Sequence, residues 1–207
     1  MINSNGLAIA FLLALSTTSA HSELALNEPR PIVQIANGKL QGVERDGIVM
    51  FKNIPYAAPP VGELRWRPPQ PPKNWTGVRD ASKFGEACPQ QLVFGYTNEL
   101  VPGNEDCLKL SIYAPKGAKD RPVMVWIHGG GLTAGASWEP YYYPPALIRE
   151  GVIVVSIDYR MGRLGFFAPQ ELIDEAKAKG EPFGNYGIMD QIQALKWVRD
   201  NIAAFGG

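Results

Sequence analysis

The amino-acid sequence predicts an α/β fold for this chain of 207 residues. Two continuous apolar runs rich in β-branched residues, at 122–127 and 152–157, are typical of strands buried on both faces of a helix-covered sheet. A long segment at 188–205 carries apolar side chains at helical spacing. This alternation of strand and helix favours a βαβ arrangement with parallel strands and right-handed crossovers. Because the sequence contains no internal repeat and no clear linker, we expect one domain.

The N-terminal part of the domain is expected to form β-hairpins. Three short strands are predicted there, at residues 32–35, 39–44 and 48–51. The Asn-Gly and Asp-Gly dipeptides at 37–38 and 46–47 are typical of the tight turns between such strands. A stretch with seven prolines follows at 55–72. A disordered linker is one interpretation of it, but Trp66 and the arginines between the prolines favour an ordered loop that packs on the domain.

The remaining elements follow the βαβ order. Residues 108–114 alternate in polarity as a half-buried strand does. Helices are expected at 144–150, 170–179 and 188–205. Asn185 is a plausible cap of the last helix. The apolar positions that predict this helix are Ile188, Ile192, Leu195, Val198 and Ile202. Trp126 and Trp197 are expected in the core.

Composition excludes several classes of function. The 20 basic and 20 acidic side chains give no net charge, and the isoelectric point is near 6.7, so the chain lacks the basic surface of a nucleic-acid-binding protein. With only 2 His and 2 Cys, it cannot assemble a zinc site of the usual ligands. We therefore expect no metal and no cofactor.

The first 20 residues are expected to be a secretory signal peptide. Residues 7–15 form an uncharged apolar run, and small residues follow it up to Ala20, where cleavage is expected. The alternative is a membrane anchor, for which this run is too short, since a spanning helix needs about 20 apolar residues. One feature departs from the signal pattern, because residues 1–6 contain no Lys or Arg. The mature chain, 21–207, would be secreted or periplasmic and would keep no stable membrane span.

The expected export bears on the state of the two cysteines, Cys88 and Cys107. In an oxidising compartment an even pair is expected to form a disulfide, and two buried free thiols are the alternative. The bond would close a loop of about 20 residues and stabilise the fold by roughly 3 kcal/mol on the chain-entropy model.

The most specific motif is His128-Gly129-Gly130-Gly131, which directly follows the predicted strand at 122–127. Glycines allow the backbone to turn tightly and to approach a ligand, and free backbone N–H groups can bind a developing oxyanion. A loop of this HGGG type after a strand forms part of the oxyanion hole in lipases and esterases. A phosphate-binding loop is a weaker interpretation, because neither GxGxxG nor GK[ST] is present. The third interpretation of the motif is a turn with a purely structural role.

The chain resembles the type-B carboxylesterase family, the cholinesterase-like α/β-hydrolases, over nearly all of its mature length. The resemblance rests on five stretches in one order: FKNIPYAAPPVGELRWRPPQPP (51–72), EDCLKLSIYAP (105–115), VWIHGGG (125–131), DYRMGRLGFF (158–167) and GNYGIMDQIQALKWVRDNIAAFGG (184–207). It implies the N-terminal part of an α/β-hydrolase fold, acting on a small-molecule ester. It also implies that Cys88–Cys107 is the family's first disulfide. Gly130 and Gly131 would supply oxyanion N–H groups, within a loop that includes His128 and Gly129.

Three residues depart from the family pattern. Asn53 stands where Gly is usual, Leu132 where an aromatic residue is frequent, and Asp158 where Asn is common. Asp158 is interpreted as a hydrogen-bonded part of the framework rather than a catalytic acid. Three arginines are expected in structural ion pairs, namely Arg65, Arg67 and Arg160.

A serine nucleophile is missing from the sequence. None of its serines has Gly at both the −2 and the +2 position, so no G-x-S-x-G elbow is present. Of the two histidines, His21 would begin the mature chain and His128 belongs to the glycine motif, so neither is expected to be the base. In the family, a strand and the nucleophile elbow follow the helix that corresponds to 188–205. The chain is therefore expected to be the N-terminal portion of a serine esterase, inactive alone, with 122–127 as an unpaired edge strand that makes residues 21–207 insoluble or partly folded. The alternatives are a non-catalytic, adhesion-type relative and a degenerate fragment or stand-alone binding module.

Overall fold

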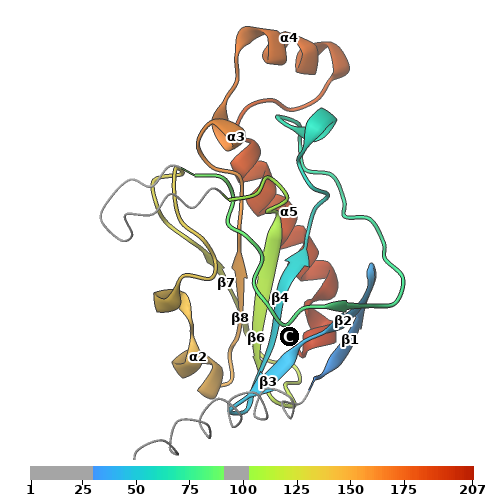
Figure 1. The fold of residues 1–207 in the computed structure, drawn as a ribbon, viewed down its shortest axis with the longest axis vertical. Coiled ribbons are helices and arrows are strands. Elements are labelled where there is room, and N and C mark those ends of the chain that lie inside the picture. The colour runs from blue at the N-terminus through green and yellow to red at the C-terminus, as the bar shows by residue number, and fades with distance from the viewer. Residues whose placement is uncertain (1–29, 91–102) are drawn as a thin grey trace, which may run out of the picture.

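The computed structural model describes residues 30–90 and 103–207 (Figure 1). The predicted signal peptide at 1–20 lies outside the described residues. Two sheets make up the fold. The smaller has the strand order β1-β2-β5 and consists of Ile32–Ile35, Gly38–Gln41 and Val78–Asp80. The larger has the order β3-β4-β6-β8-β7 and consists of Val43–Arg45, Ile48–Pro55, Lys109–Pro115, Ile153–Ile157 and Val123–Ile127.

Helices connect and cover the strands. The α-helices are α2 (Pro145–Arg149), α3 (Gly162–Phe166), α4 (Gln170–Lys179) and α5 (Tyr186–Asn201), and the 3-10 turns are Gly62–Leu64, Pro140–Tyr142 and Ile202–Phe205. The long helix α5 crosses one face of the larger sheet, while α2 lies on the other side of it and contacts β6 and β8 (Figure 1). The predicted α/β class is confirmed, with helices where 144–150 and 170–179 predict them.

The larger sheet is mixed. β7 and β8 run parallel, as the βαβ pattern predicts, whereas β3, β4, β6 and β8 pair antiparallel in succession. The predicted strand at 39–44 is divided at Gly42, where the chain leaves the smaller sheet and enters the larger one. A Cβ at Gly42 would meet the carbonyl oxygen of Met50, so the close approach of the two chain segments requires glycine at this point.

A bulge in β4 explains the departure at Asn53. The register of β4 against β6 shifts between Phe51 and Ile54, and Asn53 has a φ of 56°. This left-handed conformation causes the least steric strain in glycine, and asparagine adopts it more readily than most other residues. Asn53 therefore occupies a backbone conformation in which glycine is the least strained residue.

Strand β6 is more deeply buried than its alternating sequence predicts. Residues 109–114 are all buried, so the expectation of a half-buried strand is wrong. The reason is its central place between β4 and β8, with a core cluster on each face. One cluster includes Leu110, Ile112 and Trp197 of α5, and the other includes Tyr113 and Ile148 of α2.

Strand β7 lies at an edge of the larger sheet, so the expectation that it is buried on both faces is wrong. It pairs only with β8 among the described strands. Met124, Trp126 and Ile127 are exposed, and Trp126, at 39%, is not the core residue that was expected. The edge position itself agrees with the expectation of an unpaired strand at 122–127. Trp197 is buried, as predicted.

The predicted buried face of α5 is confirmed only toward its C-terminal end. Val198 is buried and Ile202 packs against the core. The other three predicted positions, Ile188, Ile192 and Leu195, are 38–48% exposed, and Ala194 and Trp197 face the core instead. Asn185 precedes the helix, as expected, but its side chain makes no capping hydrogen bond. Instead its carbonyl oxygen accepts the N–H groups of residues 188 and 189, at 2.9 and 3.0 Å.

The proline-rich stretch at 55–72 is an ordered loop, as predicted. The indole N–H of Trp66 donates to the carbonyl oxygen of Arg163, at 2.9 Å, and the Arg67 guanidinium binds the Glu175 carboxylate of α4, at 2.8 Å. The loop thereby joins the N-terminal half of the chain to α3 and α4. Within the part of the chain that the structure describes, no helix has the length and apolarity needed to cross a bilayer.

Candidate functional site

A glycine-rich loop, residues 128–137, begins where β7 ends. Gly130 has a φ of 115° and Gly131 a φ of 62°, so both occupy conformations that favour glycine. The N–H groups of Thr133 and Ala134 donate to the carbonyl oxygen of Gly130, at 3.1 and 3.2 Å, and fold the loop back on itself. A Cβ at Gly130 would collide with the carbonyl group of Ala134. The close contact between the two limbs of the loop therefore requires glycine here.

The N–H groups of Gly130 and Gly131 are available to a ligand. Both residues are exposed, and neither N–H donates a hydrogen bond to another described residue. The backbone of the preceding residue, Gly129, acts on the Tyr142 phenol and opposes the rise that burial causes in its pKa. Two adjacent backbone donors on a tightly turned loop can bind a negatively charged oxygen atom without any rearrangement of the chain.

His128 is buried beneath this loop. Its ring stacks on that of Tyr159, with centroids 4.6 Å apart, and its Nδ1 lies 2.9 Å from the carbonyl oxygen of Gly129. Burial lowers the pKa of His128, so the ring is neutral at pH 7. Nε2 is buried and has no hydrogen-bond partner among the described residues. A ring enclosed in this way is poorly placed to take a proton from a bound nucleophile.

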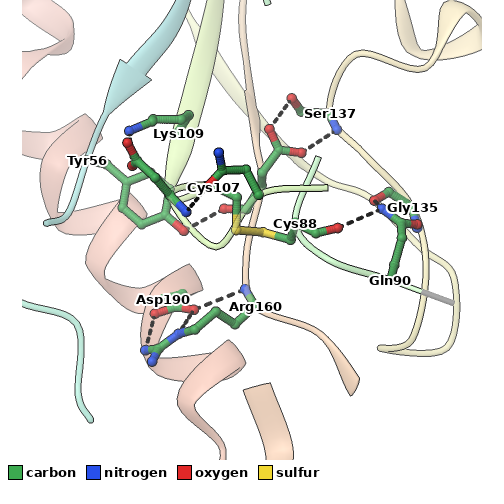
Figure 2. Close-up of a disulfide and its surroundings, with 12 residues drawn as sticks. Tyr56, Cys88, Gln90, Cys107, Lys109, Gly135, Ser137, Arg160 and Asp190 are labelled. Atoms are coloured by element: carbon green, nitrogen blue, oxygen red, sulfur yellow. Dashed lines mark hydrogen bonds and ion pairs between the residues drawn. A yellow bond between two sulfur atoms is a disulfide. The ribbon is translucent and has the colours of Figure 1, made fainter. Parts of the chain in front are cut away.

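Asp158, at the end of β8, holds the returning limb of the loop. Its carboxylate accepts the N–H of Ser137, at 2.7 Å, and the Ser137 hydroxyl, at 2.8 Å, as the bonds at Ser137 in Figure 2 show. Burial raises the pKa of Asp158 to about 6, although the two bonds from Ser137 favour the charged form. The hydroxyl of Tyr56 donates to the Asp158 carbonyl oxygen, at 2.5 Å. Asp158 is thus part of the framework, as predicted.

Tyr159 holds the outgoing limb of the same loop. Its hydroxyl donates to the carbonyl oxygen of His128, at 2.9 Å. Two consecutive residues at the end of β8 therefore fasten both ends of the glycine-rich loop, which explains why the loop lies next to the carboxyl edge of the parallel strands.

The disulfide between Cys88 and Cys107 is present, with Cα atoms 5.0 Å apart and both residues buried (Figure 2). Gln90, two residues after Cys88, contacts the loop directly. Its side-chain oxygen accepts the N–H of Gly135, at 2.7 Å, and its side-chain nitrogen donates to the carbonyl oxygen of the same residue, at 2.9 Å. Sequence patterns gave no sign of Gln90, because no local pattern marks a contact between residues 45 positions apart.

The three arginines form the structural ion pairs that were predicted. Arg160 is buried and binds Asp190 of α5 through Nε and Nη2, at 2.8 and 2.7 Å (Figure 2). Arg65 binds Glu105 with two bonds of 2.7 Å, and Arg67 binds Glu175 of α4. These charges hold the framework together, and none of the three is left unpaired as a site for an acidic substrate.

An open groove of about 540 Å³ runs beside the loop, lined by Gly131, Leu132, Thr133, Gly162, Arg163, Phe166 and Phe167. Its surface is largely apolar. Leu132 is 40% exposed, with a φ of 62°, so the departure from an aromatic residue falls at a position that faces this groove. In the part of the chain that the structure describes, no cluster of three or more metal-ligating side chains occurs.

The fold and the loop together define a domain of the α/β-hydrolase class. A family model described as "Carboxylesterase family" matches residues 29–207, and the chain belongs to this family. The chain is 41% identical to the fumonisin B1 esterase of Sphingopyxis macrogoltabida over 202 residues, which are 97% of this chain and 37% of that protein. It is 45% identical to the para-nitrobenzyl esterase of Bacillus subtilis over 181 residues, 85% of this chain and 36% of that protein.

Solved structures show the same relationship. A PNB esterase structure superposes with a TM-score of 0.75 at 41% identity, covering 86% of this chain and 36% of that one. A carboxylesterase of Geobacillus stearothermophilus superposes with a TM-score of 0.73 at 42% identity, covering 85% and 36%. The chain thus spans about a third of the length of the relatives that it matches.

Proposed function

We propose that the natural gene product is a carboxylic ester hydrolase of the serine type, and that residues 21–207 are the N-terminal part of its catalytic domain. The observation that carries this proposal is the pair of unengaged N–H groups at Gly130 and Gly131, on a loop held at the end of β7. A binding module has no evident need for such a pair. Membership of the carboxylesterase family, whose matched relatives include two proteins named as esterases, supports it.

The proposed reaction is acyl transfer through a serine ester. A serine hydroxyl attacks the ester carbonyl while a base removes its proton, and the carbonyl oxygen becomes an oxyanion in the tetrahedral intermediate. The N–H groups of Gly130 and Gly131 bind this oxyanion, together with the N–H of the residue after the serine. The alcohol then leaves, and water releases the acid from the acyl-enzyme. The serine, its base and the acid that orients the base are contributed by residues beyond this stretch, so the 207-residue chain alone is inactive.

The ester is a small molecule, and the acyl or alcohol group next to Gly131 packs in the groove beside Leu132 and Phe166. Neither a metal nor a cofactor takes part. We further propose that residues 1–20 direct export and are removed, so that the mature enzyme is secreted or periplasmic. N-terminal sequencing of the exported protein checks this, because it should begin at His21. Retention of Met1 in the mature protein contradicts it.

The function is tested on the natural gene product in two steps. The coding DNA is sequenced past codon 207, where a G-x-S-x-G elbow is expected within roughly 20 codons, in a strand-turn-helix context. Hydrolysis of p-nitrophenyl butyrate is then measured. If the gene product has another residue at the serine position and does not hydrolyse the ester, the protein is the non-catalytic relative. If a stop codon follows Gly207 and the product does not hydrolyse the ester, the protein is a degenerate fragment or a binding module. Either result overturns the proposal.

Gly130→Ala tests the role of the loop. The new Cβ would displace the Ala134 carbonyl and move the two donors, and we expect kcat to fall about 100-fold or more. Gly117→Ala is the matched control. Gly117 also has a positive φ, of 69°, but no atom would contact its Cβ, and it lies in the turn after β6, so backbone strain alone should leave kcat within about 2-fold. Equal kcat values for the two variants would contradict the assigned role.

A further inference from the structure

The side chain of Gln90 pairs with the backbone of Gly135 much as a neighbouring strand would. The carboxamide oxygen accepts the Gly135 N–H, at 2.7 Å, and the carboxamide nitrogen donates to the Gly135 carbonyl, at 2.9 Å. The second hydrogen of that nitrogen is directed at the Cys88 carbonyl oxygen, at 3.2 Å. One side chain therefore joins the backbone at the disulfide to the backbone of the glycine-rich loop (Figure 2).

The position of Gly135 affects the position of the N–H groups of Gly130 and Gly131. A Cβ at Gly135 would collide with the His128 ring and the Gly129 carbonyl oxygen, so the returning limb of the loop lies directly on the outgoing limb. The preceding residue, Ala134, also lies close to Gly130, because a Cβ at Gly130 would collide with the Ala134 carbonyl. A displacement of Gly135 toward the outgoing limb therefore presses on Gly129 and Gly130, and a displacement away from it opens the turn.

The other end of the bridge is buried and closely packed. Cys88 and Cys107 are 1% and 0% exposed, and their disulfide holds Cys88 against the segment that leads into β6. The Asn104 N–H donates to the Ala87 carbonyl oxygen, at 2.8 Å. Gly103 packs so closely on the Cys88 backbone that a Cβ there would overlap it. Gln90 is thus fixed to a part of the core that does not depend on the loop.

We propose that Gln90 is a positioning residue of the oxyanion hole: its two hydrogen bonds to Gly135 fasten the glycine-rich loop to the Cys88–Cys107 disulfide and hold the N–H groups of Gly130 and Gly131 in place. The proposal rests on the esterase function proposed above. Gln90 does not contact the substrate. Its effect is on the transition state, because a misplaced donor weakens binding of the oxyanion more than binding of the neutral ester.

Gln90→Met tests this proposal, since methionine is unbranched and fills a similar space without the carboxamide. Gln170→Met is the matched control, because Gln170 lies on the exposed surface of α4 and its side chain bonds only Asp174 among the described residues. In the natural gene product we expect Gln90→Met to lower kcat roughly 10-fold to 100-fold, with KM within about 2-fold, as for displacement of a catalytic group by about 1 Å. The control should match the wild type in both constants.

Hydrogen exchange of peptides that cover residues 128–137, followed by mass spectrometry, provides a readout independent of activity. Loss of the bond at the Gly135 N–H should speed exchange in this segment about 10-fold in Gln90→Met, and β6 peptides should exchange as in the wild type. An unchanged exchange rate in 128–137, or an unchanged kcat in an active enzyme, overturns the proposal. If the wild type hydrolyses no ester, the proposed function fails, and exchange alone still decides whether Gln90 holds the loop.

Gln90→Glu separates positioning from a general loss of structure. A charged glutamate can accept the Gly135 N–H but repels the carbonyl oxygens of Gly135 and Cys88, whereas the protonated acid can donate to one of them. The ratio of kcat in this variant to kcat in the wild type at the same pH should therefore rise several-fold between pH 8 and pH 5. A constant ratio over this range contradicts the role given to the second hydrogen bond.

Discussion

Replacing Asp158 by asparagine should stabilise the protein above pH 6 and leave its stability nearly unchanged near pH 4. Asp158 is buried, and its carboxylate accepts two hydrogen bonds, both from Ser137. An asparagine can keep both, because its oxygen accepts the Ser137 N–H and its nitrogen donates to the Ser137 hydroxyl oxygen. The Tyr56 hydroxyl bonds the backbone carbonyl of Asp158 and is not disturbed. The substitution therefore removes one ionisable group with little change of packing.

The magnitude follows from the pKa of the carboxyl group. Burial raises the pKa of Asp158 from 3.8 to about 6, so the folded protein holds a proton that the unfolded chain has already released. The stability that the protonated carboxyl contributes is fully present below about pH 3.8 and is lost as the pH rises through about 6. Each pKa unit corresponds to about 1.4 kcal/mol, so roughly 3 kcal/mol is lost across this window. The substituted asparagine has no proton to release and avoids that loss.

Urea unfolding of the natural gene product and of Asp158→Asn, followed by tryptophan fluorescence between pH 4 and pH 8, measures the effect. The difference in unfolding free energy between the two proteins should rise from near zero at pH 4 to about 3 kcal/mol at pH 8. Comparing the variant with the wild type at each pH cancels the titration of every other group, provided that the two proteins have the same m-value.

Ser137→Ala supplies the control. It removes the hydroxyl that favours the charged carboxylate, so it should raise the pKa of Asp158 further and move the loss of stability to higher pH. A difference between Asp158→Asn and the wild type that stays within about 0.5 kcal/mol at every pH would refute the reasoning. So would a variant that becomes less stable than the wild type as the pH rises, because Asp158 would then be stabilised as an anion.

Three further predictions concern stability and solubility. Replacing both Cys88 and Cys107 by Ala should lower the unfolding free energy by about 3 kcal/mol on the chain-entropy model, and a loss below about 1 kcal/mol in urea unfolding would contradict it. Asp190→Ala should cost about 3–5 kcal/mol in the same assay, because Arg160 would stay buried without its carboxylate partner; a cost below about 1 kcal/mol would show that Arg160 finds water instead. Trp126→Lys should raise the soluble yield of the 207-residue chain expressed alone, since a charge on an exposed edge strand opposes pairing with other chains, and an unchanged yield would argue against β7 as the site of aggregation.

Local patterns in the sequence predicted the elements well but not their surroundings. The apolar run at 122–127 and the run at 152–157 have similar compositions, and both form strands, yet β8 is completely buried and β7 is half exposed. An apolar composition indicates that a strand is able to be buried on both faces. Whether the strand is in fact buried depends on its position in the sheet, and the order of strands in the sheet is set by contacts between distant segments.

Helix α5 shows the same limit. Five apolar positions at helical spacing predicted its buried face, and Val198 and Ile202 do lie on the core. Ile188, Ile192 and Leu195 are exposed, and the helix presents Ala194 and Trp197 to the core in their place. Helical spacing identifies the helix because apolar side chains recur along a stripe. When a helix is apolar over more than one stripe, the packing partner decides which stripe is covered.

The sequence by itself determined the α/β class and the turn at Gly129-Gly130-Gly131, because both depend on residue types at short spacing. It predicted a disulfide between the two cysteines from their even number and the expected export, and the structure shows that bond. Only the tertiary structure decided how that turn is held. Gln90 reaches Gly135 across 45 positions, and Asp158 reaches Ser137 across 21. Hydrogen bonds of this kind leave no periodic trace in a sequence, since a single polar side chain meets the backbone only after the sheet, the disulfide and the loop have been brought together by folding.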